Sequence, residues 1–255
     1  MKVVWVIAVN TFKEIIRDRI LYGLLVFAVL LMGLSLALGT LSFREQARIT
    51  ADFGLMGVHL SAVILSIFVG STLVSREIDK RTIFTLLSHA VTRTQFLAAK
   101  TLGMLLVLMA IMGGLTGILL LLFKFLQMPI TDTFFLAVLG VFLESAILLS
   151  IIVLFGIFSS PMLSVTFTLG LFLIGHWLND LKFFAEKSED PAFKKFATVI
   201  IYGLPNLERF NWRSQVTYDE VLSVQTVASA AVYAGSWVLI CFALAALIFR
   251  KRDFV

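Results

Sequence analysis

Three ionisable side chains lie inside long apolar stretches of this sequence, where they are candidates for chemistry: His59, Glu144 and His176. An ionisable residue at membrane depth is costly to desolvate and is by default a functional-site hypothesis. Glu144 is therefore a candidate for lining a translocation path or for carrying a proton, and His59 is a second candidate for that path. Both His59 and His176 are also of the type that ligates metal ions.

A structural role for the same residues is the interpretation that the sequence favours. Glu144 has no evident acidic or basic partner in the apolar runs, so we expect a neutral carboxyl group hydrogen-bonded to a serine hydroxyl or a backbone carbonyl. No carboxylate or cysteine is spaced with the histidines, and the sequence therefore predicts no metal site. The third histidine, His89, lies in a charged segment and is expected to contact solvent or a partner protein.

Enzymatic activity has little support in the sequence. Intramembrane hydrolysis requires a nucleophile with a base, paired acids or metal ligands, and Glu144 with isolated histidines meets none of these requirements, so we predict no catalytic residues. The phosphate-binding pattern G-x-x-x-x-G-K-[ST] is also missing from the sequence. We therefore predict no cofactor bound by this chain, and any ATP must be handled by another polypeptide.

The composition predicts an all-α integral membrane protein. Of the 255 residues, 60% are hydrophobic and only 15% are charged, against about a quarter in soluble proteins. Uncharged runs longer than about 20 residues can cross the hydrocarbon core, and a single span must be helical to satisfy its backbone. The net charge of +5 collects at the ends of these runs, so we predict contact with lipid and none with nucleic acid. A single cysteine, Cys241, excludes a disulfide framework.

The hydrophobic pattern predicts one membrane domain over residues 1–255. An amphipathic elbow helix in the headgroup region is expected over 3–18. An external segment that partly dips into the membrane is expected over 179–224, and Pro205 should end its helix. Six spans are predicted, at 20–41, 53–74, 101–123, 133–158, 161–178 and 225–249.

Short polar patterns indicate where the helices begin. Two capping boxes, in which a threonine is followed three residues later by glutamine or glutamate, predict helix starts before the third and sixth spans. Two serine–proline or aspartate–proline pairs predict an N-cap followed by proline at the first helical position. The four signals are Thr92 with Gln95, Thr217 with Glu220, Ser160-Pro161 and Asp190-Pro191. Gly113 and Gly117 form a weak GxxxG pattern for close helix packing.

The charged segment 75–100 lies between two of the predicted spans and has a helical period. Its apolar residues recur at positions i, i+3, i+4 and i+7 from Ile83, with charged and hydroxyl residues on the other face. Such a helix, tied to spans at both ends, can transmit a push from a soluble partner into the bilayer. A solvated connecting loop is the alternative.

The distribution of basic residues predicts that this segment and both termini are cytoplasmic. With six spans, 12 of the 21 basic residues lie on the side of the termini. Only three lie in the short loops of the other side, and six lie in the long external segment, which counts little toward orientation.

The chain resembles the type-2 permeases of ATP-binding-cassette (ABC) transporters over its whole length. The most specific residues are Ser75-Arg76-Glu77, Thr82, Leu86-Leu87-Ser88, Arg93, Lys100 and the end Phe249-Arg250-Lys251-Arg252-Asp253-Phe254. Two positions depart from the pattern: Ala90 stands where proline is usual, and Arg81-Thr82 where glycine-threonine is common. The stretch 204–216 is similar to permeases of cofactor-maturation and gliding-motility systems.

The resemblance implies a permease dimer, from identical or related copies, in the bacterial inner membrane. Each copy would be contacted by a cytoplasmic ATPase subunit, which holds ATP and magnesium, through a coupling helix at 76–88. The residues implied in this coupling are Arg76, Glu77, Lys80, Arg81, Leu86, Leu87 and Arg93. The substrate path would lie between the copies, lined mainly by the second and fifth spans and capped by an external helix near 191–204, and export is the expected direction.

Two other functional classes remain open. A secondary transporter usually shows repeated halves with broken helices, but residues 1–125 and 126–255 show no repeat and only the Pro161 junction is interrupted. A non-transporting membrane scaffold would assemble with the same partners without moving cargo.

Overall fold

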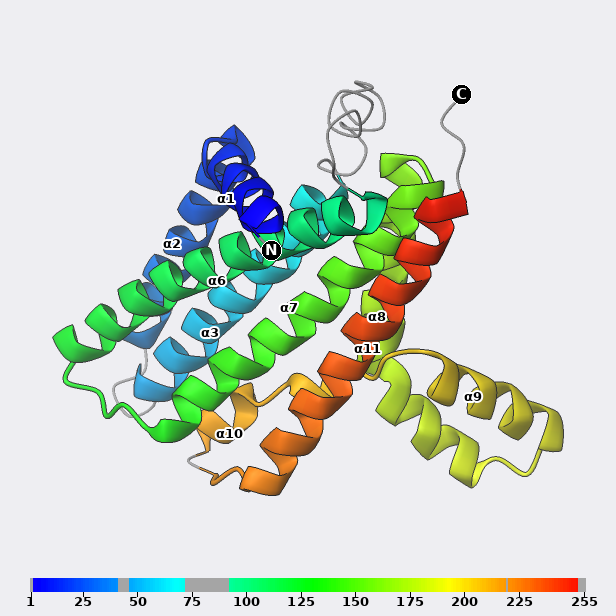
Figure 1. The fold of residues 1–255 in the computed structure, drawn as a ribbon. Helices are drawn as coiled ribbons and strands as arrows, with labels where there is room; N and C mark the ends of the chain where they lie inside the picture. Colours follow the sequence, from blue (N-terminus) through cyan, green and yellow to red (C-terminus); the bar gives the residue numbers. More distant parts are fainter. Residues whose placement is uncertain (1, 41–45, 72–91, 219, 252–255) are drawn as a thin grey trace.

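The computed structural model describes residues 2–40, 46–71, 92–218 and 220–251, and the regular elements within these ranges are all helices (Figure 1). The long helices are α1 (Lys2–Ile16), α2 (Arg19–Thr40), α3 (Gln46–Ile64), α6 (Arg93–Phe125), α7 (Asp132–Phe158), α8 (Pro161–Lys187), α9 (Pro191–Gly203) and α11 (Val224–Lys251). The short ones are the π-helix η1 (Leu65–Val69), the 3-10 turn η2 (Glu208–Phe210) and α10 (Arg213–Thr217).

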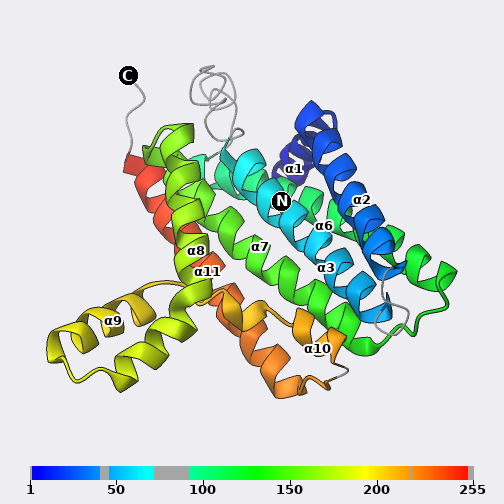
Figure 2. The same ribbon diagram turned by 180° about the vertical axis from the view of Figure 1, so that it is seen from behind.

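Helix α7 forms the centre of the bundle. It contacts α3, α6, α8 and α11, and from behind it lies between α3 and α8 (Figure 2). Its sequence is apolar on nearly every side, as expected for a helix that is surrounded by other helices. In its most apolar 18-residue window, 67% of the residues are buried, against 22% in the equivalent windows of α8 and α11.

The prediction of an all-α membrane protein is confirmed. Within the described residues, five helices are long and apolar enough to cross a membrane: Arg48–Val69, Arg93–Phe125, Asp132–Phe158, Pro161–Lys187 and Val224–Arg250. Helix α2 adds a shorter apolar stretch, Leu21–Leu34. Six spans and the elbow's position in the headgroup region stay predictions.

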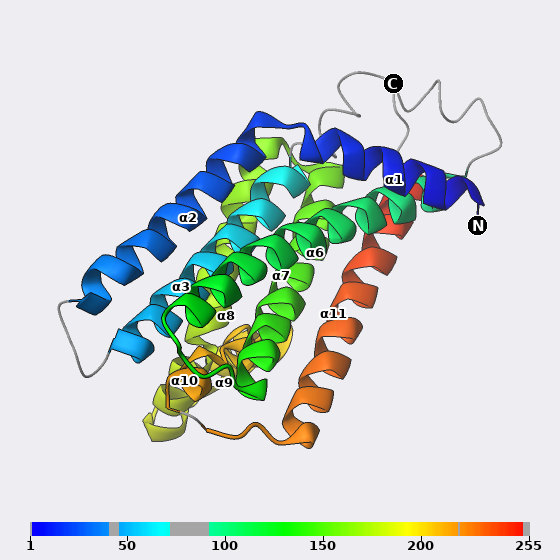
Figure 3. The same ribbon diagram turned by 90° about the vertical axis from the view of Figure 1, so that its left-hand side faces the viewer.

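Helix α1 crosses over the first half of α6 (Figure 3). Gly103 of α6 allows this crossing, because a Cβ atom there would lie 2.7 Å from the Ala8 carbonyl oxygen and 2.7 Å from the Thr11 Cβ. Ala8 and Thr11 are fully buried by the contact. The absent side chain thus lets two helix backbones meet.

Two of the predicted helix starts are confirmed with their hydrogen bonds. The Thr92 side chain accepts a hydrogen bond from the Gln95 backbone N–H, and the Gln95 side chain accepts one from the Thr92 backbone N–H. Asp190 accepts a hydrogen bond from the Ala192 backbone at 2.9 Å. Ser160 is the N-cap of α8 with proline next, although its hydroxyl accepts no capping hydrogen bond from the first turn.

The predicted capping box at Thr217 and Glu220 is wrong. The Thr217 hydroxyl donates instead to the Arg213 carbonyl oxygen at 3.2 Å and lies inside α10. Helix α11 begins at Val224, and its cap is Ser223, whose hydroxyl accepts a hydrogen bond from the Thr226 backbone N–H at 3.1 Å. Several threonine and serine residues compete for this role, and the tertiary position of the chain selects among them.

Helix α8 is longer than the fifth predicted span and continues to Lys187. After a short turn, α9 runs back along it, so that the two form a hairpin at one side of the bundle (Figure 1). The helix that Pro205 was expected to end already stops at Gly203.

The chain after α9 returns into the bundle as segment 204–212, which is irregular apart from the 3-10 turn η2. Its side chains Leu207, Phe210 and Trp212 are almost fully buried. Glycines make room for it: a Cβ at Gly140 would lie 2.5 Å from the Phe210 carbonyl oxygen, and one at Gly175 would lie 2.8 Å from Leu207. Backbone without helical hydrogen bonds is tolerated inside a membrane protein where other parts of the protein surround it.

The GxxxG pattern of α6 makes no contact within the described chain. A Cβ placed at Gly113 or Gly117 would meet no atom within 4 Å. The close approach that the sequence associated with the glycines of this helix occurs at Gly103 instead.

We predict that Gly103→Ala lowers the stability of the protein in detergent by about 1–3 kcal/mol, because the added methyl overpacks the crossing of α1 and α6. The matched control is Gly113→Ala on the same helix, where the methyl meets open space and the helix gains the higher propensity of alanine. Apparent melting temperatures measure both. A Gly103→Ala protein as stable as Gly113→Ala would contradict the close crossing.

Candidate functional site between α3, α7 and α8

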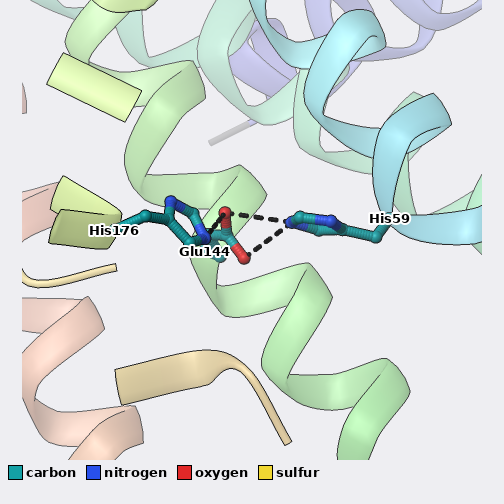
Figure 4. A group of neighbouring side chains, drawn as sticks. All are labelled: His59, Glu144 and His176. Carbon is teal, nitrogen blue, oxygen red and sulfur yellow. Dashed lines mark hydrogen bonds and ion pairs between the residues drawn. The ribbon is translucent and has the colours of Figure 1, made fainter. Parts of the chain in front are cut away.

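Three ionisable side chains from three different helices meet in the bundle (Figure 4). His59 extends from α3, Glu144 from α7 and His176 from α8. His59 is 5% exposed, Glu144 is 1% exposed, and the His176 side chain is 18% exposed. One ligand atom from each residue lies within 4.8 Å of the others. We call this group the His-Glu-His cluster.

Both oxygens of the Glu144 carboxyl group lie within hydrogen-bonding distance of the His59 ring. The distances from His59 Nε2 to Glu144 Oε1 and Oε2 are 3.1 and 3.0 Å. An ionised carboxylate would accept a hydrogen bond from Nε2–H of His59, whereas a protonated carboxyl group would donate one to an unprotonated Nε2, and these distances fit both arrangements. The pair joins α3 to the central helix through a buried hydrogen bond.

His176 approaches the same carboxyl group from α8 with its Nε2 atom. Its Nδ1 lies 3.0 Å from the Phe172 carbonyl oxygen and donates a hydrogen bond to it. In a neutral ring, Nε2 then has a lone pair and no proton. That atom lies 3.5 Å from Glu144 Oε1, is buried, and has no hydrogen-bond partner.

An aromatic ring and a returning segment of the chain lie beside the cluster. The Phe172 ring lies 4.6 Å from the His176 ring and 6.2 Å from the His59 ring, centroid to centroid. Gly175, the neighbour of His176, accepts a backbone hydrogen bond from Leu207 in the buried segment 204–212. On α3, six residues after His59, the helix widens into the π-helix η1, a form that is frequent at functional sites.

The expectation that Glu144 has no ionisable partner is wrong. Glu144 was expected to have no ionisable partner in the membrane and to bond a serine or a carbonyl, but its described partners are two histidines. No carboxylate is spaced with the histidines along the sequence, but Glu144 of α7 lies beside both of them in the structure. Glu144 and His59, the path candidates, therefore lie together, and His176 joins them although the sequence had placed it only among candidate metal ligands.

Of the predicted coupling residues, only Arg93 lies in the described part of the chain. The others, Arg76, Glu77, Lys80, Arg81, Leu86 and Leu87, lie outside it and stay predictions. Arg93 begins α6, and its guanidinium donates a hydrogen bond to the Phe249 carbonyl oxygen at 3.2 Å, near the end of α11. About two turns further along α6, Lys100 lies 3.7 Å from Glu14 of α1.

The fold and site define a multi-pass membrane protein whose helical bundle encloses an ionisable cluster, which is the general build of a membrane transport subunit. The family described as ABC-2 family transporter protein matches residues 5–254, nearly the whole chain. The protein therefore belongs to this family and is a permease component of an ABC transporter. A search of curated proteins found no match to the chain.

We predict that His59→Leu lowers the free energy of unfolding by about 3 kcal/mol in chelator-treated protein, because it leaves the Glu144 carboxylate buried without its main partner. His59→Leu combined with Glu144→Leu should recover most of this loss, since an apolar pair of similar volume needs no hydrogen bond. A double-mutant cycle in detergent measures the coupling. Simple additivity of the two single effects would contradict the pairing.

Proposed function

We propose that the chain is the membrane subunit of an ABC exporter in a bacterial inner membrane, and that a separate cytoplasmic ATPase powers it. The family match over residues 5–254 supports the permease role. Two copies, identical or related, would form the transport unit, with the termini and the coupling helix at 76–88 in the cytoplasm. ATP and magnesium would be bound by the partner, since this sequence lacks a phosphate-binding loop.

The observation that best supports mechanical coupling is the set of contacts at the start of α6. The predicted coupling helix leads directly into this start, where Thr92 caps the helix. Arg93 joins it to the end of α11, and Lys100 joins it to α1 through Glu14. A displacement of the coupling helix would therefore move α6 together with α1 and α11.

The exposure of the helices bears on the proposed path between two copies. Helix α8, the fifth predicted span, is only 22% buried over its most apolar window and exposes Phe167, Leu173 and Trp177. The second predicted span is 67% buried by its own chain over the same length of window. A path between copies would therefore be lined more by α8 than by α3, with the α8–α9 hairpin beside its external end.

The proposal assumes that ATPase closure shifts the permease pair between inward-open and outward-open states. Each state requires rearranged helix contacts, and the least covered helices are the ones free to exchange partners. Helices α8 and α11 have this property, whereas α7 remains enclosed.

The first experiment is affinity purification of the full chain in mild detergent and identification of its companions. A stoichiometric soluble ATPase supports the proposal. Its absence in several detergents would favour a secondary transporter or a membrane scaffold, and a bound ATPase without nucleotide-dependent cargo movement would favour the scaffold.

We predict that Glu77→Arg abolishes most of the permease-stimulated ATPase rate while the protein still inserts in the membrane, because it reverses a charge on the proposed contact with the ATPase. Glu186→Arg, the same change on the exposed end of α8, is the control and should leave the rate unchanged. Equal rates in Glu77→Arg and wild-type complexes would remove Glu77 from the coupling contact.

A further inference from the structure

We propose that the His-Glu-His cluster binds one divalent transition-metal cation of the zinc class. The ligands are Nε2 of His59, Nε2 of His176 and the carboxylate of Glu144. The proposal concerns a site within one copy of the chain, so it stands or falls independently of the ATPase partner and the direction of transport.

The spacing of the three groups fits such an ion. Zinc bonds of about 2.0–2.1 Å in a tetrahedral arrangement place neighbouring ligand atoms about 3.3 Å apart. The nitrogen–oxygen distances are 3.0 and 3.1 Å from His59 and 3.5 Å from His176, and all three groups lie within 4.8 Å. Small side-chain rotations therefore suffice to surround a cation.

His176 is already oriented as a metal ligand. Histidines that bind metals almost always donate their other ring N–H to a carbonyl or carboxylate, which fixes the tautomer and the ring plane. The Phe172 carbonyl accepts this hydrogen bond from Nδ1, four residues earlier on the same helix. The remaining Nε2 lone pair is buried without a hydrogen-bond partner and is directed at a carboxylate oxygen, an arrangement that a cation between them relieves.

The types of ligand select the class of cation. Two imidazoles and one carboxylate form the set found at zinc sites with three protein ligands, which leave one coordination position open. Calcium and magnesium prefer all-oxygen ligands and are disfavoured here. Binding requires an unprotonated Nε2 on His59. A neutral ring with its proton on Nε2 must therefore move that proton to Nδ1, and a doubly protonated ring must release one proton to solvent.

The three ligands come from three helices, so an ion would tie α3 and α8 to α7. His59 lies on the largely buried second predicted span, whereas α8 is largely exposed and lies against segment 204–212. Occupancy of the site would therefore hold the more exposed helix against the core of the bundle.

The test uses the full chain in detergent, purified with a tag that contains no histidine and stripped with a chelator. Co²⁺ replaces Zn²⁺ in such sites and reports four-coordinate geometry through its visible absorption. Wild-type protein should bind one Co²⁺ per chain and show the visible absorption bands of a four-coordinate Co²⁺ site. Zn²⁺ should displace the ion and raise the apparent melting temperature, and excess Mg²⁺ should do neither.

Glu144→Gln and His176→Gln should each weaken binding by about 10-fold or more, because loss of a ligand exceeds the effect of losing an outer partner. His89→Gln, which alters the histidine outside the cluster, is the matched control and should bind like wild type. Size-exclusion profiles check that each variant is folded.

Wild-type protein without stoichiometric Co²⁺ binding, or with bands that are not four-coordinate, overturns the proposal even if a variant fails to fold. Unchanged binding in both cluster variants, or loss of binding in His89→Gln, also overturns it. Proton uptake by the cluster with no metal binding would assign it to proton carriage instead.

Discussion

The hydrocarbon core offers no hydrogen bonds, and the structure depends on how each polar group placed there finds a partner. Glu144 is the clearest case, because a buried carboxyl group on the most enclosed helix needs polar partners from other helices. Nε2 of His59 lies 3.1 and 3.0 Å from the two Glu144 oxygens, and His176 approaches the same group from α8. The central position of α7 makes this compensation possible, since it is the helix that contacts both α3 and α8.

The same constraint governs the backbone. The irregular segment 204–212 enters the bundle only where its polar groups and its bulk are accommodated. The Leu207 backbone N–H donates to the Gly175 carbonyl oxygen, and the Asn206 backbone N–H donates to the Tyr233 hydroxyl. Gly140 and Gly175 lack the side chains that would block its path. Packed protein thus fills the bundle beside the ionisable cluster.

A buried ionisable cluster and helices that are linked at one end of the bundle are two features of this ABC-2 family permease. The contacts of Arg93 and Lys100 connect the start of α6 to α11 and α1, so that force applied at this start reaches three helices. The cluster lies on a different set of helices, α3, α7 and α8. Helix α7 contacts α6 and α11 as well as α3 and α8, and α3 also contacts α6, so events at the two places would be coupled through these shared contacts.

The sequence by itself determined the class of the protein and much of its local structure. Long apolar runs require helices in lipid, and the starts at Thr92 and Asp190 follow from capping chemistry that involves only neighbouring residues. The sequence misplaced the cap of α11 at Thr217, because the choice between Thr217 and Ser223 depends on where α10 packs. Only the tertiary structure decided that Glu144 meets His59 and His176. These residues are 85 and 32 positions from it along the chain, and no spacing rule within one helix relates them.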